Sequence, residues 1–402
     1  MSSWRTYRIA DLGRVVTGKT PPSSQPELFD GPIPFITPSD MSFDHRHIST
    51  ERFVSADWDS KQRTLLPEGA VCVVCIGATI GKICMSDKPS QTNQQINSVI
   101  VDQARFDQGF VYYGLRTKAG ELLARAAGAA TPIINKTAFS EVEIAAPPLE
   151  TQRRIASILG AYDDLIEVNR RRIAVLEEMA RGLFEEWFVR FRFPGHEAVP
   201  ILDTPDGPLP EGWQRVPFGT VADNFDRLRK PLSGQQRLGM SGPYPYYGAA
   251  KVFDYIDSYI FEGLHLLIAE DGSVITPDGF PVLQLADGKF WVNNHAHVVK
   301  GCGDVSTEYL YLALSRQPIQ GYITGAAQPK ITQANLNRIV ITVAKKSLMT
   351  QFSTIASTLF SLALSLQNAN ERLAASRDLL LPRLIAGQLS VVEAERQLEE
   401  AA

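Results

Sequence analysis

The feature that most constrains the fold of this chain is a long internal repeat, in which residues of the first half recur about 200 positions later. Both halves carry an Ile-Ala-Ser-x-Leu run and an earlier Asn-rich run. The matched segments, first half against second, are Trp4 with Trp213, 93–97 with 293–297, 128–134 with 325–331, and 147–159 with 348–359. Solenoid repeats are only about 20 to 50 residues long, so this period indicates two copies of one domain.

Each half has the same predicted plan: a globular part rich in Gly, Pro, aromatic and β-branched residues, followed by one long helix. Strands are predicted at 71–76, 96–101, 264–268 and 338–343, and short helices at 121–127 and 307–314. The predicted division is 1–149 first globular domain, 150–192 first long helix, 193–212 Pro/Gly-rich linker, 213–345 second globular domain, 346–392 second long helix, and 393–402 tail. The fold class is therefore α+β, with two pseudo-symmetric mixed α/β domains and two long antiparallel coiled-coil helices.

The two long helices are predicted from apolar residues at alternating steps of four and three, which is the spacing of a coiled-coil seam. The seam residues are Ile155, Leu159, Tyr162, Ile166, Ile173, Leu176 and Leu183 in the first helix, and Ile355, Leu359, Leu362, Leu366, Leu373 and Leu380 in the second. Asn169 and Ser376 interrupt the seams, and a buried Asn can fix the register of such a pair. Pro382 and Gly387 are expected to end the second helix.

The length of these helices suggests a spacer. A helix of about 35 residues is roughly 50 Å long, which exceeds the roughly 34 Å of one DNA turn. We therefore expect the paired helices to keep two similar domains a fixed distance apart along a duplex.

Composition limits the other classes of protein. The chain is 44% hydrophobic and 21% charged, as expected for an ordinary globular protein. No uninterrupted apolar run of about 18 residues and no signal peptide are visible, so we expect no membrane segment and a cytoplasmic location.

Cys72, Cys75 and Cys84 are predicted to be buried structural thiols, because no second Cys or His pair completes a metal site. The net charge of −4 means that DNA affinity must come from local patches or from partners.

Two patterns suggest catalysis or metal binding but lack the required context. The run from Gly13 to Thr20 has the spacing of a phosphate-binding loop, yet no strand precedes it and Pro21-Pro22 prevents the helix that must follow. His45 with His47, and His295 with His297, lack a third ligand. Motifs of a methyltransferase or nuclease are absent. We therefore predict a binding protein with no cofactor or metal, and keep a nucleotide-dependent enzyme that uses Lys19 as an alternative.

The residues predicted to contact DNA are basic, hydroxyl-bearing or aromatic side chains in loops of both halves, suited to contacting phosphates, sugars or base edges. They are Lys19, Thr20, Arg46, Arg52, Lys61, Arg63, Thr79 and Lys82 in the first half, and Arg227, Arg229, Lys230, Arg237, Tyr244, Tyr246, Tyr247 and Lys251 in the second. For any one of them the alternative is an ordinary solvated loop residue. The presence of such loops in both copies supports the regions rather than the individual residues.

Six short motifs in order resemble the specificity subunits of type I restriction-modification systems, and the resemblance covers essentially the whole chain. They are 18–21 with 33–38, 147–156, 184–196, 244–250, 293–297 and 380–384. Each is weak alone, whereas six on a duplicated frame are specific. The second half departs from the pattern at 344–347, where the first half has Pro147-Pro148.

The resemblance implies a non-catalytic chain in which each globular domain is a target recognition domain that reads one half of a split double-stranded DNA target. It implies that the spacer helices set the gap and bind two methyltransferase subunits, which use S-adenosylmethionine, and it leaves room for a restriction/translocase subunit. A different class, a coiled-coil scaffold whose globular heads bind protein or peptide, stays open at this point.

Overall fold

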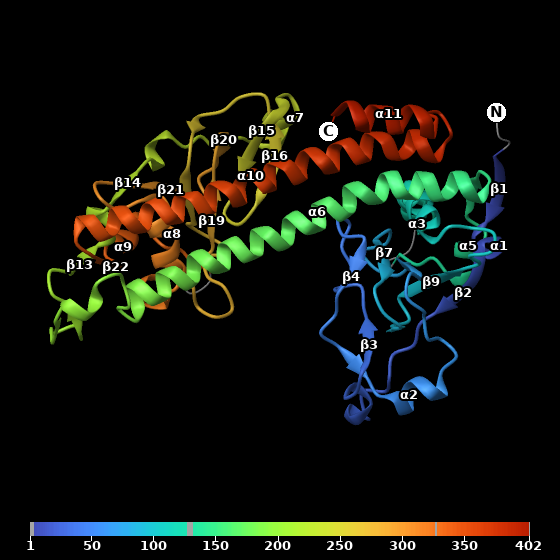
Figure 1. Cartoon of the computed structure of the whole chain (residues 1–402), viewed down its shortest axis with the longest axis horizontal. Helices are drawn as coiled ribbons and strands as arrows, with labels where there is room; N and C mark the ends of the chain where they lie inside the picture. Colours follow the sequence, from blue (N-terminus) through green and yellow to red (C-terminus); the bar gives the residue numbers. More distant parts are fainter. Residues whose placement is uncertain (1–3, 127–131, 326–327, 402) are drawn as a thin grey trace. The chain divides into compact units, whose positions relative to one another are not determined.

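The computed structural model describes residues 4–126, 132–325 and 328–401 (Figure 1). These residues form two compact units. Unit 1 comprises Met1–Arg170 and Asn368–Ala402, and unit 2 comprises Arg171–Gln367. The long helices α6 (Leu149–Phe184) and α10 (Lys346–Ile385) each contribute one part to each unit. Parts of the matched segments 128–134 and 325–331 lie outside the described residues.

Unit 1 is built on a five-stranded sheet with the order β2-β9-β6-β7-β4 and a three-stranded sheet with the order β5-β3-β8. The strands are β1 (Arg5–Arg8), β2 (Gly13–Thr17), β3 (Ile33–Ile36), β4 (His47–Ile48), β5 (Phe53–Val54), β6 (Val71–Val74), β7 (Ile83–Ser86), β8 (Gln91–Thr92), β9 (Ile96–Val101) and β10 (Glu143–Ala146). The shorter helices are α1 (Ile9–Leu12), α2 (Ala56–Lys61), α3 (Gln108–Thr117), α4 (Ala119–Ala126), α5 (Lys136–Ser140) and α11 (Val391–Ala401). The separate pair β1·β10 is antiparallel.

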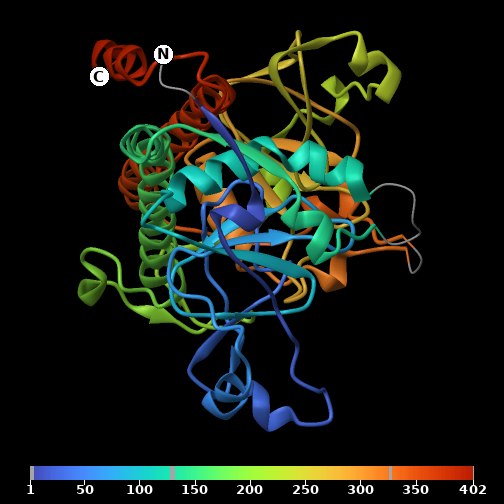
Figure 2. The same ribbon diagram turned by 90° about the vertical axis from the view of Figure 1, so that its right-hand side faces the viewer.

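The core of unit 1 combines both ends of the chain. Every residue of β6 is buried, as expected for a central strand whose two faces are both covered. One face packs against α3, and the same core includes Leu381, Leu384 and Ile385 at the end of α10. Gly387 is so close to Trp4 that an added Cβ would lie 2.6 Å from the indole Nε1. Figure 2, which faces unit 1, shows β1 and α11 on the same side of this unit.

Unit 2 repeats this plan with a four-stranded sheet of order β14-β21-β18-β19 and a second four-stranded sheet of order β16-β15-β20-β17. Its strands are β11 (Ile201–Leu202), β12 (Leu209–Pro210), β13 (Gln214–Pro217), β14 (Ala222–Asn224), β15 (Ser241–Tyr247), β16 (Val252–Ile256), β17 (Phe261–Glu262), β18 (His265–Ala269), β19 (Leu283–Ala286), β20 (Lys289–Val292), β21 (Ala296–Gly301) and β22 (Val340–Val343). Its shorter helices are α7 (Gly234–Leu238), α8 (Thr307–Ser315) and α9 (Gln333–Asn337).

The two units have corresponding topologies, which confirms the duplication predicted from the sequence. The order β2-β9-β6-β7 matches β14-β21-β18-β19, and β1·β10 matches β13·β22. The pair β3·β8 is parallel, as is the pair β15·β20. Asp107 caps α3 and Ser306 caps α8 with a side-chain oxygen that accepts a backbone N–H. The α+β class of two mixed domains with long helices is therefore correct.

The long helices pair antiparallel within each unit. In unit 1, Asn169 Nδ2 donates to Asn370 Oδ1 at 2.9 Å, and the Arg377 guanidinium binds Asp163 at 2.5 Å. As the residue number rises on α6 it falls on α10. In unit 2 the Phe184 ring contacts the Phe352 ring, with centroids 6.1 Å apart. Asn169 is buried as predicted, whereas its polar partner Asn370 was not anticipated.

The predicted seam of the first helix agrees with burial better than that of the second. Ile155, Leu159 and Ile166 are buried, while four members are half-buried: Tyr162, Ile173, Leu176 and Leu183. In the second helix, Ile355 and Leu362 are 42% and 50% exposed, and four more are half-buried: Leu359, Leu366, Leu373 and Leu380.

The buried face of α10 lies one residue away from the predicted seam. Its buried members are Phe352, Ala356, Phe360 and Ala363. Phe352 packs against aromatic rings of unit 2, including Phe188 at 4.9 Å and Tyr309 at 5.7 Å between centroids. The heptad of Leu and Ile gave the wrong phase because aromatic and small side chains, rather than aliphatic ones, fill the space against this core.

The end of the second helix also differs from the prediction. Pro382 lies inside α10, which continues to Ile385, and Gly387 follows it with φ of 66°. Proline removes one helical hydrogen bond, yet the surrounding Leu381, Leu384 and Ile385 are held in the core of unit 1. Residues expected to form a tail fold as α11. The Pro/Gly-rich segment 193–212 contains the hairpin β11·β12, and Phe193 and Leu209 are buried in the core of unit 2.

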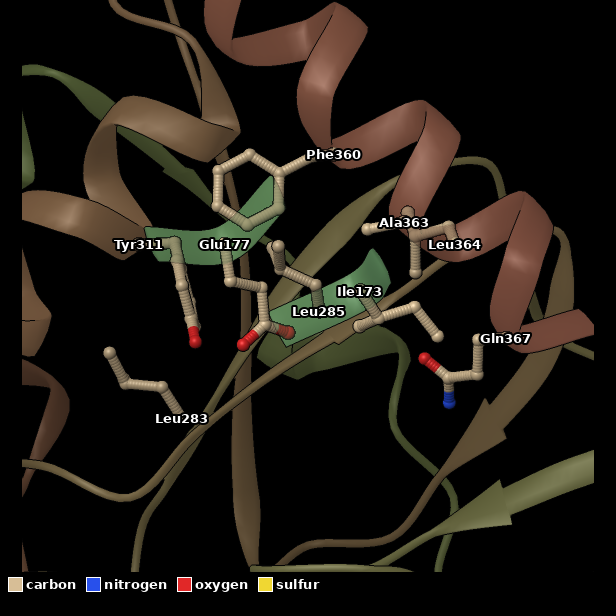
Figure 3. A pocket seen from close by; sticks show the side chains of 9 residues that line it. All are labelled: Ile173, Glu177, Leu283, Leu285, Tyr311, Phe360, Ala363, Leu364 and Gln367. Atoms are coloured by element: carbon tan, nitrogen blue, oxygen red, sulfur yellow. The ribbon is translucent and has the colours of Figure 1, made fainter. Parts of the chain in front are cut away.

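The paired helices leave one small pocket in unit 2, with a volume of about 100 Å³ (Figure 3). Ile173, Phe360 and Ala363 line it from the helices, and the Tyr311 hydroxyl and the Glu177 carboxylate point toward each other. The Glu177 carboxylate also accepts a hydrogen bond from Arg181 at 2.7 Å.

By length and composition alone, α10 could cross a membrane. One such helix is weak evidence, since a protein's core helix passes the same test, and α10 carries core residues such as Phe352 and Leu384 in the two units.

Candidate nucleic-acid interface

In unit 1, three loops meet where β2, β3 and β8 end. Because β3 and β8 are parallel, their carboxyl ends lie at the same edge, and Asn93 N donates to Ile36 O at 3.1 Å. Gly18 lies directly against the third segment, since an added Cβ would be 2.2 Å from Thr92 O. We call the segments 18–20, 37–40 and 93–95 the unit 1 loop edge.

Two of the predicted DNA-contacting residues, Lys19 and Thr20, lie in the unit 1 loop edge, and two more, Arg52 and Lys82, donate hydrogen bonds to it. Lys19 is exposed, and the Thr20 hydroxyl donates to Gln94 Oε1. The Arg52 guanidinium donates to Thr37 Oγ1 at 2.6 Å and to Ser39 Oγ at 2.9 Å. Lys82 Nζ donates to Pro38 O at 3.1 Å. The edge therefore collects two lysines, an arginine and several hydroxyls and amides from segments that are far apart in the sequence.

The other predicted residues of the first half lie elsewhere in unit 1. Arg46 binds Asp164 on α6, so its charge is compensated within the fold. Lys61 pairs with Asp57 at 2.7 Å along α2, and Thr79 lies in the turn between β6 and β7. Arg63 is exposed after α2, and its carbonyl accepts a hydrogen bond from Arg14.

Unit 2 has a corresponding edge with the same turn. Asn293 N donates to Tyr247 O at 3.1 Å, which links the loop after β20 to the end of β15. The Asn293 side chain accepts from His295 N at 2.8 Å, just as the Asn93 side chain accepts from Gln95 N at 3.1 Å. A short Asn side chain that bonds the backbone two residues later stabilises such a turn. The duplicated Asn motif thus forms the same local structure in both units.

The three tyrosines predicted beside this edge differ in exposure. Tyr246 is buried, and its hydroxyl accepts from Leu232 N at 2.9 Å. Tyr247 packs edge-on against Phe290, with centroids 5.6 Å apart. Tyr244 is half-buried and contacts the exposed Tyr259, whose centroid is 5.1 Å away.

Tyr259 and Lys289 form a surface feature that the sequence prediction missed. The Lys289 ammonium is 4.6 Å from the centroid of the Tyr259 ring, a distance suited to a cation–π contact. The pKa of Lys289 is raised, chiefly by its interaction with the Tyr259 hydroxyl. In the sequence, Tyr259 is merely an aromatic residue in a polar turn. The sequence does not reveal that Lys289 lies beside this turn in the folded protein.

Among the basic residues predicted in the second half, two are engaged within unit 2. Arg229 donates to Glu270 Oε2 at 2.6 Å and to Ala296 O at 2.7 Å. Arg237 donates to Leu232 O at 2.7 Å and pairs with Asp254 at 3.2 Å. Three others are exposed: Arg227, Lys230 and Lys251. These three exposed residues and the cluster of Tyr244, Tyr259 and Lys289 are the candidate DNA-contacting residues of unit 2.

Asp226, Glu270 and His297 place three ligand atoms within 4.8 Å of one another, a geometry that a metal ion could use. The donors are already engaged. Glu270 binds Arg229 and Lys330, the latter at 2.9 Å, and the His297 imidazole donates to Asp226 at 2.6 Å and to Ile331 O at 2.9 Å. Both partners of His297 are hydrogen-bond acceptors, so its ring nitrogens are engaged within the protein. Burial alone would raise the pKa of Asp226, but the hydrogen bond and charge of His297 lower it. This arrangement fits an internal ion-pair network better than a metal site.

The remaining sequence predictions concern cysteines and the apparent phosphate loop. Cys72, Cys75 and Cys84 are buried as predicted, and burial raises the pKa of Cys72 to about 12 and of the other two to about 11. They are therefore thiols rather than reactive thiolates at neutral pH. Gly13–Thr17 forms β2 instead of a loop, and no α-helix follows Thr20 before β3. The geometry of a phosphate-binding loop is absent from this described segment.

The chain matches a protein family described as "Type I restriction modification DNA specificity domain" over residues 1–178 and 210–372. It is 26% identical to the type I restriction enzyme MjaIX specificity subunit of Methanocaldococcus jannaschii, over 97% of this chain and 94% of that protein. It is 37% identical to the HindI specificity subunit of Haemophilus influenzae over 39% of this chain and 35% of that protein.

The fold is similar to the crystal structure of the type I restriction-modification S subunit from M. genitalium. The TM-score is 0.59 at 17% identity, with 95% of this chain and 96% of that chain covered. The family match includes both halves of the chain, and this likeness agrees with the duplicated mixed α/β fold. The chain therefore belongs to the family of type I restriction-modification specificity subunits.

Proposed function

We propose that this chain recognises DNA for a type I complex, with each unit reading one half of a split double-stranded target. The observation that carries the proposal is the loop edge present in both units. The same Asn turn, at Asn93 and at Asn293, lies beside parallel strand ends and exposed basic or aromatic residues. Arginine, lysine and tyrosine side chains so placed can contact phosphates and base edges.

We further propose that α6 and α10 bind two methyltransferase subunits and that their length sets the gap between the half-targets. Each unit exposes a pair of apolar side chains on its own part of α6, at spacings of three and four residues that place each pair on one face of the helix: Leu165 with Val168 in unit 1, and Val175 with Met179 in unit 2. An exposed apolar patch is typical of a surface that a partner covers. S-adenosylmethionine would be bound by the methyltransferase, and a restriction/translocase subunit would join the same complex in the cytoplasm.

In this proposal, the partner subunits carry out methylation and cleavage, and this chain carries out neither. The acid–histidine cluster of unit 2 is engaged in ion pairs, and the buried cysteines are protonated. The overall charge of −4 fits a chain whose partners supply many of the phosphate contacts.

The test is methylation mapping with the chain and its methyltransferase produced together. We expect modified adenines at one split sequence, and replacement of residues 1–149 by those of a relative should change one half-target only. Replacement of residues 213–345 is the matched experiment and should change the other half. If no sequence-specific methylation appears and random duplexes are bound no better with the methyltransferase than without it, the chain is a protein-binding scaffold instead. If one replacement alters both half-targets, the division of labour is wrong.

A further inference from the structure

A groove on unit 1 holds two arginines that form no ion pair with any acid that the structure describes. It has a volume of about 280 Å³ and is lined by β1, the turn before α3 and the first residues of α6. Arg5 and Arg105 are both exposed. The Arg105 guanidinium carbon lies 5.0 Å from the centroid of Phe106 and 5.9 Å from that of Tyr7, so two rings hold it in place. We call this the arginine groove.

Neither arginine of the groove forms an ion pair with an acid of unit 1 that the structure describes, although the pKa of the nearby Asp11 is lowered, chiefly by its hydrogen bond to Arg8 and to a smaller extent by the charge of Arg105. Arg105 Nη1 donates to a backbone carbonyl, Asp11 O, at 3.5 Å. The Asp11 carboxylate itself binds Arg8 at 3.3 Å. Arg5 makes no ion pair with any residue that the structure describes. Exposed arginines are common on protein surfaces, whereas the same place in unit 2 is built differently.

In unit 2 the corresponding place is closed by an ion pair. Arg105 stands two residues before the cap of α3, and Asp304 stands two residues before the cap of α8. The segment that leads into the repeated helix sequence carries Pro147-Pro148 in unit 1 and Lys345-Lys346 in unit 2. Lys346 Nζ lies 2.8 Å from Asp304 Oδ1. Unit 1 therefore has the cation Arg105 where unit 2 has the acid Asp304, and uncharged prolines in the segment where unit 2 has the cation Lys346.

We propose that the arginine groove binds an acidic side chain of the partner methyltransferase, so this inference rests on the proposed function. Two guanidinium groups can each offer paired N–H donors to a carboxylate. The Tyr7 and Phe106 rings, with Pro147 and Leu149, supply apolar contact for the residues beside that acid. Such a mixture of aromatic, apolar and arginine side chains is typical of protein–protein contacts.

The position of the groove favours a protein over DNA. It lies beside the turn after Val101, at one end of β9, whereas the unit 1 loop edge lies at the other end before Ile96. Six residues of a strand span roughly 20 Å. The groove is therefore separate from the surface that we propose for reading bases.

The test compares full-length chains for their affinity toward the methyltransferase, measured by sedimentation at several salt concentrations. The double variant Arg5→Glu/Arg105→Glu should bind the methyltransferase at least about tenfold more weakly, and its affinity should depend less on salt. Arg5→Lys/Arg105→Lys should retain most of the affinity, because the charge is kept. The control Lys88→Glu/Lys136→Glu makes the same charge change at exposed sites outside the groove and should alter affinity less than about twofold.

Each outcome decides the proposal. Unchanged association of the Arg5→Glu/Arg105→Glu chain, with unchanged thermal unfolding, would refute it. Normal association combined with weaker DNA binding and a shallower salt dependence would also refute it and would assign the groove to a phosphate. If the unmodified chain fails to bind the methyltransferase, the proposed function fails as well, whereas a failure confined to the variants affects the groove alone.

Discussion

The buried ion pair between the two long helices of unit 1 allows a quantitative prediction. Asp163 and Arg377 have side chains that are only 6% and 3% exposed. The Asp163 carboxylate also accepts from the Tyr113 hydroxyl at 2.6 Å, and Arg377 keeps a second contact to Asp378 at 2.9 Å. Burial alone would lower the pKa of Arg377, yet its hydrogen bonds to Asp378 and Asp163 raise it, so the guanidinium stays charged.

Asp163→Leu replaces the carboxylate by a larger apolar side chain and leaves a buried charge poorly compensated. Removing one partner of such a pair costs about 3–5 kcal/mol, and we expect the lower end because Asp378 remains. The double variant Asp163→Leu/Arg377→Met should lose only about 1–2 kcal/mol, because only the Tyr113 hydroxyl is left without its acceptor. The two substitutions should therefore be coupled by roughly 1–2 kcal/mol or more.

Hydrogen exchange of the α3 amides measures this local stability in the full-length chain. A loss of about 3 kcal/mol should accelerate exchange roughly 150-fold. The control is Asp164→Leu, where the exposed neighbour pairs with Arg46 and the expected cost is below about 1 kcal/mol. The reasoning is refuted if Asp163→Leu and Asp164→Leu accelerate exchange equally, or if the double variant is less stable than Asp163→Leu alone.

Two further predictions concern unit 2 and the unit 1 loop edge. Burial lowers the pKa of His265 to about 4, below its ordinary 6.5. As the pH falls from 6.5 to 4, the unfolded chain takes up the proton before the folded chain does. The free energy of unfolding of unit 2 should therefore decrease by up to about 3 kcal/mol over this range. Denaturant unfolding of His265→Phe should show a smaller loss over this window, and an identical pH profile would contradict the prediction. Gly18→Ala should weaken DNA binding by the assembled complex about tenfold or more, because its Cβ would lie 2.2 Å from Thr92 O and push the 18–20 segment outward. Gly120→Ala, where a Cβ meets nothing within 4 Å, is the control, and equal DNA affinity of the two variants in gel-shift titration would contradict the prediction.

The duplicated arrangement of two mixed domains and two long helices could be predicted because the repeat is visible in the sequence itself. Recognising it requires no knowledge of tertiary contacts. The strands at 96–101 and 264–268 and the helix at 307–314 agree closely with β9, β18 and α8. The phase of α10 was missed because its position is set by Phe352 and Phe360, which contact rings from other segments.

The predicted site residues are harder to judge from sequence, because exposure depends on partners distant in the chain. Arg46 finds its acid 118 residues later and Arg229 finds one 41 residues later. A basic residue in a loop looks the same in the sequence whether or not such an acid folds beside it. Which of the exposed residues contact bases stays a prediction.

The contribution of both chain ends to unit 1 has a consequence for biosynthesis. Unit 2 is one continuous stretch, Arg171–Gln367, and can fold as soon as it leaves the ribosome. The core of unit 1 includes Leu381, Leu384 and Ile385, so this unit cannot be completed until the end of α10 has been translated. Unit 2 is therefore the first unit that can fold completely, although most of unit 1 is translated before it. A premature stop codon shortly after residue 367 would leave unit 1 incomplete and unit 2 intact.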